Sequence, residues 1–156
     1  MKENIRQLNI VREINAPREQ VYKAWTDTEL LKQWWGPNGV TNPVCELDLR
    51  PGGSINIVML AGSELGDLAG SEWPITGIFQ EIIPPSKLVY TSSAVLDGKP
   101  ILDTTNTLTL EDHDGKTKMT LNITVTRTAP EAEGPLSGME VGWNQSLDKL
   151  IKQVEN

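Results

Sequence analysis

The chain has 156 residues, of which 14 are basic and 21 acidic, so its formal net charge at neutral pH is -7. A chain of this length can bury a sizeable core, and we expect residues 1–156 to form a single domain. The acidic balance repels the phosphates of nucleic acids and of anionic membranes, so neither is an expected partner.

The cysteine content and the amino-terminal sequence indicate in which cellular compartment the protein is expected. Cys45 is the single cysteine of the sequence, which excludes an intramolecular disulfide and a cysteine-rich zinc motif. The amino terminus lacks the continuous apolar core of a signal peptide, and no later run reaches the roughly 20 apolar residues of a membrane span. We therefore expect a cytoplasmic protein.

One strand and one helix are predicted at the start of the chain. Apolar residues alternate from Leu8 to Ile14, which predicts a strand that ends at Asn15. Pro17 suits the first turn of a helix, which then runs to Trp25.

A second short helix is predicted directly afterwards. Thr26 and Glu29 have the spacing of a capping box, in which a hydroxyl and a carboxylate satisfy free amides at a helix start. The pair Gly36–Pro37 ends the helix. Its apolar residues fall in two pairs four residues apart, Leu30 with Trp34 and Leu31 with Trp35. Such a wide apolar stripe must be covered by a larger element.

The middle of the chain has the alternation of β-strands. Turn signals such as Asp114–Gly115 separate the alternating runs. The segment 61–70 is rich in glycine and small residues and is predicted to be a loop. It is either a mobile flap or a tolerated insertion, and we favour the insertion. The predicted strands cover residues 44–49, 55–59, 75–83, 88–95, 104–111 and 117–126.

A long amphipathic helix is predicted at the end of the chain. Its start lies near Pro130 or near Ser137, which forms a second capping box with Glu140. Gly142 inside the helix costs stability, so a close approach to the sheet or an interior space is expected there. The apolar stripe consists of Met139, Trp143, Leu147, Leu150 and Val154.

The order of these elements predicts an α+β fold in which an antiparallel sheet buries its apolar face against the final helix. With these elements in this order, the sequence resembles the START-like or SRPBCC superfamily, known also from the birch-pollen allergen fold. The nearest branch is similar to the domain of activators of the ninety-kilodalton heat-shock chaperone ATPase. The resemblance rests on the motifs Asn15–Asp27, Gln33–Pro37, Asp48–Gly53, Gly77–Ile82 and Gly142–Leu150.

The resemblance implies a helix-grip fold: a curved antiparallel sheet of about seven strands wraps around a long carboxy-terminal helix, with two short helices after the first strand. It also implies a cavity that binds a hydrophobic or aromatic small molecule. Two alternatives stay open: a chaperone-binding module of the stress response, and a cavity enzyme that acts on polyketide-like or aromatic compounds. No cofactor is implied, and the number of subunits stays open between a monomer and a homodimer.

Six residues are the candidate ligand contacts, because tryptophan and tyrosine offer flat faces with a polar group and methionine adapts to irregular shapes. For each of them ordinary core packing is the alternative. They are Trp143 and Met139 on the final helix, Met59, Trp73 and Tyr90 on strands, and Trp34 on the second short helix.

Catalytic and metal-binding patterns are weak in this sequence. His113, the single histidine, lies beside a predicted turn and is expected to be solvated, as are the carboxylates around it. No metal site, nucleotide-binding loop or nucleophilic triad is predicted. If the strand registers are shifted by one residue, Glu46, Asp48, Asn106 or Tyr90 points inward, where an acid–base group would be needed.

Overall fold

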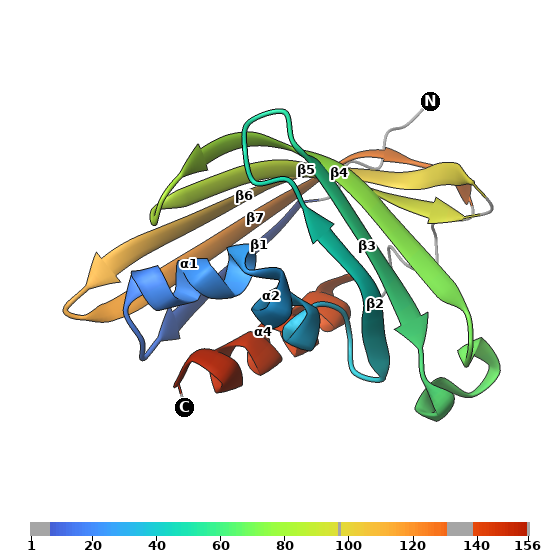
Figure 1. Cartoon of the computed structure of the whole chain (residues 1–156), viewed down its shortest axis with the longest axis horizontal. Helices are drawn as coiled ribbons and strands as arrows, with labels where there is room; N and C mark the ends of the chain where they lie inside the picture. The colour runs from blue at the N-terminus through green and yellow to red at the C-terminus, as the bar shows by residue number, and fades with distance from the viewer. Residues whose placement is uncertain (1–6, 97, 131–138, 156) are drawn as a thin grey trace.

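A computed structural model describes residues 7–96, 98–130 and 139–155 of the chain. A strongly curved antiparallel sheet forms one layer, and the described helices α1, α2 and α4 lie on its concave side (Figure 1). This is the predicted α+β helix-grip architecture, which is therefore confirmed.

Seven strands form one sheet in the order β1-β7-β6-β5-β4-β3-β2. Consecutive strands from β2 to β7 are neighbours, so they form a meander of hairpins, while the first strand of the chain pairs with the last. Their bounds are β1 Gln7–Ile14, β2 Val40–Leu47, β3 Ser54–Ala61, β4 Glu72–Ile83, β5 Lys87–Leu96, β6 Lys99–His113 and β7 Lys116–Thr128.

The register of β6 and β7 follows the alternation of the sequence. Leu108 of β6 pairs with Leu121 of β7, and Asn106 pairs with Ile123. Three of these four residues are apolar, and all four belong to the face of the sheet that is turned toward the helices. The inward residues of β7 from Met119 to Val125 are at most 1% exposed. The threonines between them face solvent more, as expected for a sheet with one wet face.

Two short helices, α1 (Arg18–Thr26) and α2 (Thr28–Trp34), follow β1. The predicted capping box is wrong: Thr26 is the last residue of α1, and its hydroxyl donates to the carbonyl oxygen of Tyr22. Asp27 instead caps α2, since its carboxylate accepts from the amide of Glu29 at 2.9 Å.

The segment predicted as a loop around residues 61–70 contains 3-10 turns over Ser63–Leu68, kinked at Gly66, at the end of the β3–β4 hairpin. The long final helix is α4, Met139–Glu155. The predicted capping box at Ser137 and a helix start near Ser137 fall in residues 131–138, outside the described residues, whereas Pro130 is described and does not belong to α4.

Polar contacts hold α4 against the start of the chain. Arg12 on β1 donates to Asp148 at 3.0 Å and to Asn144 at 2.7 Å. Gln20 on α1 donates to the carbonyl oxygen of Val154 at 2.8 Å. Beneath these contacts, Leu147 and Leu150 are fully buried in the core. The final helix therefore closes the fold by packing on both β1 and α1.

Two glycines of the family-like motifs differ in what the fold requires of them. A Cβ on Gly142 in α4 would meet only the Cβ of Pro37, at an ordinary 3.8 Å, so the expected close approach is absent there. A Cβ on Gly77 in β4 would overlap the carbonyl oxygen of Thr91 on β5.

The two alanine substitutions are therefore expected to have opposite effects. Gly142→Ala removes backbone freedom from the unfolded chain and should raise the free energy of unfolding by about 0.5–1 kcal/mol. Gly77→Ala forces β4 and β5 apart and should lower it by about 1–3 kcal/mol. Urea denaturation of both variants checks the pair, and equal shifts would contradict the assigned geometry.

Candidate functional site

A small cavity lies between the two short helices and the half of the sheet formed by β2 to β5. Its volume is about 20 Å³, which is room for about one water molecule. Most of its lining is buried, and only Leu47 at the end of β2 is partly exposed among the described lining residues. The lining consists of Trp25, Leu31, Trp35, Leu47, Ile55, Ile57, Phe79, Leu88 and Tyr90.

Four of the five tryptophans form a closed ring of contacts beside this cavity. Trp25 on α1 packs edge-on against Trp34 at 4.7 Å between ring centroids and stacks on Trp143 at 6.2 Å. Trp35 completes the ring, at 5.9 Å from Trp34 and 5.4 Å from Trp143. The ring joins α1, α2 and α4 to one another, so a movement of any of these helices disturbs the cavity wall.

Two polar atoms of the cavity-lining residues lack a hydrogen-bond partner among the residues that the structure describes. They are the indole nitrogen of Trp25 and the phenolic oxygen of Tyr90. Trp25 is 3% exposed and Tyr90 4%. By contrast, the indole nitrogen of Trp34 donates to the carbonyl oxygen of Ala24 at 3.0 Å. Burial of these two unpaired groups therefore lowers the stability of the fold, whereas the indole of Trp34 has its hydrogen bond.

A buried polar cluster lies next to Tyr90 on the inward face of β5 and β6. The Ser92 and Thr104 hydroxyls are 2.6 Å apart. The Asn106 side-chain amide donates to Thr104 at 3.0 Å and to the carbonyl oxygen of Tyr90 at 3.3 Å. Asn106 is 1% exposed, so this cluster satisfies itself inside the fold.

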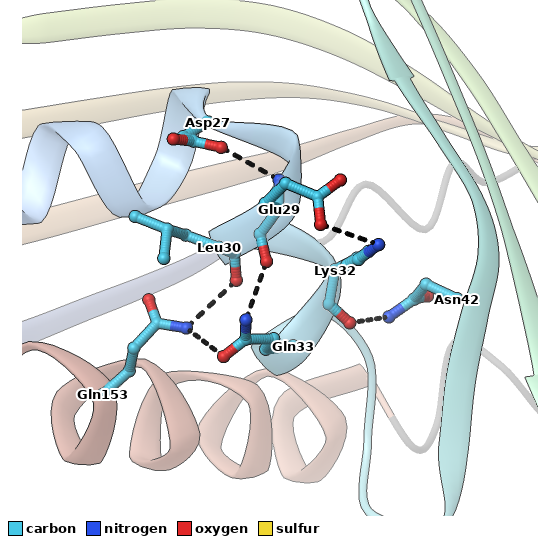
Figure 2. A network of polar contacts seen from close by, with 7 residues as sticks. All are labelled: Asp27, Glu29, Leu30, Lys32, Gln33, Asn42 and Gln153. Carbon is cyan, nitrogen blue, oxygen red and sulfur yellow. Dashed lines mark hydrogen bonds and ion pairs between the residues drawn. The ribbon is translucent and has the colours of Figure 1, made fainter.

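Side chains of α4 and β2 form hydrogen bonds with α2 (Figure 2). Gln153 on α4 donates to the carbonyl oxygen of Leu30 and to Gln33, both at 3.1 Å. Asn42 on β2 donates to the carbonyl oxygens of Lys32 and Trp35, both at 2.9 Å. Together with the bond from the Trp34 indole to Ala24, these bonds tie α2 and the residue after it to α1, α4 and β2.

Of the six candidate ligand contacts, Tyr90 is the one that lines the cavity. Trp143 and Met139 are partly buried and pack against the core, with Trp143 touching the lining residues Trp25 and Trp35. Trp34 is fully buried behind the lining.

Met59 and Trp73 are cross-strand neighbours on β3 and β4. Met59 packs against the core cluster, whereas the indole of Trp73 donates to the Ser71 hydroxyl at 3.0 Å. Neither residue lines the cavity, and no residue of α4 does. The space seen in the structure therefore lies beneath α1 and α2 rather than directly beneath α4.

The other lining residues were predicted as core or helix-stripe residues rather than as a site. The i, i+4 pair of Leu31 and Trp35 gave a signal, and both residues reach the cavity, Leu31 from α2 and Trp35 from the extended residue that follows it. Trp25 has the same spacing with Val21, but that pair predicted a helix and not a site. Of the four polar residues considered for the interior, Asn106 and Tyr90 are buried, whereas Glu46 is exposed and Asp48 pairs with Arg50 at 2.8 Å.

The reactive residues of the chain lie apart. Cys45 is on β2, at one edge of the sheet, and three strands separate it from His113 on β6. Burial raises the pKa of the Cys45 thiol to about 11, so it is protonated at neutral pH. Among the described residues, no three His, Cys, Asp or Glu side chains gather where they could hold a metal ion.

His113 is exposed, as expected, and pairs with Glu13 of β1 at 2.7 Å. The hydrogen bond with Glu13 raises the pKa of His113 above its ordinary 6.5, and the same bond lowers the pKa of Glu13. Stability from the raised histidine pKa is present at low pH and is lost as the pH rises through the folded-state value. The glutamate contribution is lost as the pH falls through its own lowered value.

An NMR titration of the single histidine checks this pair. We expect the midpoint above 6.5 in the native chain and a return toward 6.5 in Glu13→Gln, which keeps the shape but removes the charge. Glu111→Gln, on the same hairpin, is the control. An unchanged midpoint in Glu13→Gln would contradict the ion pair.

Comparison with known proteins identifies the family. The family model described as "Activator of Hsp90 ATPase homolog 1-like protein" (AHSA1) matches residues 15–155. The chain belongs to the AHSA1 family. The match runs from the residue after β1 to the last residue of α4, so it includes both short helices, the cavity lining and the tryptophan ring. It confirms the resemblance found in the motifs.

Solved structures share the AHSA1 fold over nearly the whole chain. A protein of Chromobacterium violaceum is 28% identical with a TM-score of 0.81, over 96% of this chain and 97% of that one. A Nitrosomonas europaea protein is 27% identical with a TM-score of 0.78, over 96% and 94%. The AHSA1 protein of Silicibacter pomeroyi is 25% identical with a TM-score of 0.76, over 96% and 98%. No match was found among the curated proteins.

Within residues 7–96, 98–130 and 139–155, no helix combines the length and the apolar character needed to cross a bilayer.

Proposed function

We propose that this AHSA1-family chain binds an apolar or aromatic small molecule in an enlarged form of the cavity beneath α1 and α2. The observation that carries the proposal is the lining itself: aromatic and aliphatic side chains from both helices and from four strands converge on one space. Ligand sites are typically concave and mostly apolar, with a few polar groups that fix orientation.

Binding requires the cavity to expand, because drug-sized ligands occupy roughly 300–1,000 Å³ and the present space is about 20 Å³. The seven-residue helix α2 is the element that we expect to move, and its movement has to loosen the contacts of Trp34 in the tryptophan ring. It is tied down by Gln153 and Asn42 (Figure 2), and its last turn leads directly into the lining residue Trp35. Moving α2 outward separates Leu31 and Trp35 from the strands opposite.

Native mass spectrometry of the chain purified without detergent is the direct test. A mass excess that is lost on denaturation, followed by organic extraction, would identify the ligand class. A clean protein mass together with no binding of the aromatic probe acetophenone, titrated by calorimetry, would contradict the proposal.

Trp143→Ala separates a ligand role from simple packing. Trp143 supports the cavity wall through Trp25 and Trp35, so the variant should lose more probe affinity than stability. Trp73→Ala, which alters a tryptophan outside the core cluster, is the control. Equal losses of affinity and of unfolding free energy in Trp143→Ala would indicate packing alone.

A chaperone-binding module is the second candidate, because the family description names an activator of the Hsp90 ATPase. The ATPase rate of a purified chaperone of this class, measured with and without the chain, tests it. Stimulation that saturates with the chain would favour this function, and an unchanged rate would count against it.

Catalysis has less support in the cavity. Tyr90 is the titratable group among the described lining residues, and burial raises the pKa of its phenol well above the usual range. A phenol that stays protonated can donate a hydrogen bond, but it cannot act as a base at neutral pH.

A further inference from the structure

Two of the cavity-lining residues carry buried polar atoms that have no partner among the described residues. Five buried side-chain atoms lack a partner among the described residues, and two of the five belong to residues that line the cavity. Close by, the side chain of Asn106 and the indole of Trp34 are both hydrogen-bonded. The fold can therefore satisfy polar groups in this region, and Tyr90 and Trp25 stand out.

Both unpaired groups are hydrogen-bond donors. An indole nitrogen donates and does not accept. The phenol of Tyr90 stays protonated because burial raises its pKa, so it too is available as a donor. No lysine, arginine or histidine occurs among the described lining residues, so a buried carboxylate would lack a countercharge. The remaining lining side chains are apolar.

We propose that the ligand is a neutral aromatic or apolar carbonyl compound whose oxygen accepts hydrogen bonds from the phenol of Tyr90 and the indole of Trp25. This inference rests on the proposed binding function and adds the chemical class of the ligand. The carbonyl oxygen supplies the acceptor that the two donors lack, and the apolar frame occupies the aliphatic and aromatic lining. A carboxylate of the same shape is excluded by the cost of burying its charge.

Three probes of nearly the same shape test the assignment: acetophenone, α-methylstyrene, in which a CH₂ group replaces the carbonyl oxygen, and benzoate. We expect the native chain to bind the first two, and benzoate at least tenfold more weakly than acetophenone. Tyr90→Phe should weaken acetophenone binding about tenfold, which is one lost hydrogen bond, and should change α-methylstyrene binding less than twofold.

Tyr22→Phe is the matched control, because its phenol is also buried without a partner among the described residues but lies outside the cavity lining. It should leave all affinities unchanged. Urea denaturation of both variants confirms that each is folded before titration.

The outcomes separate the inference from the function on which it rests. If the native chain binds neither acetophenone nor α-methylstyrene, the proposed binding function fails, and this inference fails with it. If both bind and Tyr90→Phe affects them equally, or if benzoate binds as well as acetophenone, the function stands and the carbonyl assignment is overturned.

Discussion

Trp34→Ala is expected to lower the free energy of unfolding by about 3–5 kcal/mol, the usual cost of truncating a fully buried tryptophan. Trp34 is 0% exposed and contacts both Trp25 and Trp35 in the tryptophan ring. Its removal also leaves the carbonyl oxygen of Ala24 without the indole donor. The substitution thus opens a void where α1 and α2 meet.

Trp73→Ala provides the comparison for this prediction. Trp73 is partly exposed, and its indole is bonded to Ser71 only two residues away. Its loss should cost about 1 kcal/mol, as for an average substitution. Chemical denaturation of both variants measures the two losses of unfolding free energy. Losses of similar size would show that the tryptophan ring does not hold the helices together.

Tyr90→Phe is expected to raise the free energy of unfolding by about 1–3 kcal/mol, because it removes a buried hydroxyl that has no partner among the described residues. The aromatic ring and its edge-on contact with Phe79 at 6.4 Å are retained. The same substitution should weaken binding of a carbonyl ligand. Stability and affinity therefore change in opposite directions in this variant.

Tyr22→Phe should give a smaller gain, since the Tyr22 side chain as a whole is only partly buried. Thermal and urea denaturation measure both effects. A loss of stability in Tyr90→Phe would mean that the hydroxyl does have a partner in the folded chain, and the argument for an unpaired donor would fail.

The sequence predicted the sheet well because its signals are local. The alternation from Met119 to Val125 placed the inward face of β7 correctly, and the Asp114–Gly115 turn placed the β6–β7 hairpin. The prediction of a capping box at Thr26 and Glu29 was wrong for an equally local reason. Both Thr26 and Asp27 are residue types that can cap a helix. The Thr26 hydroxyl is bonded within α1, so Asp27 caps α2 instead.

The cavity could not be placed from the sequence, because it depends on how large side chains from distant elements fill a common volume. Trp34 and Trp35 are adjacent, yet one packs between helices and the other lines the cavity. The helix ends at Trp34 and Trp35 adopts an extended backbone, which sends the two rings in different directions. No periodicity argument gives that change of direction.

The pairing of the first strand with the last has a consequence for synthesis on the ribosome. Gln7 pairs with Thr124, and Gln20 on α1 is bonded to Val154 near the end of α4. The amino-terminal strand and helix therefore emerge first but find their partners last, whereas the β2–β7 meander joins neighbours in sequence. The meander can assemble as it emerges, whereas β1 and α1 find their partners only after β7 and α4 have emerged.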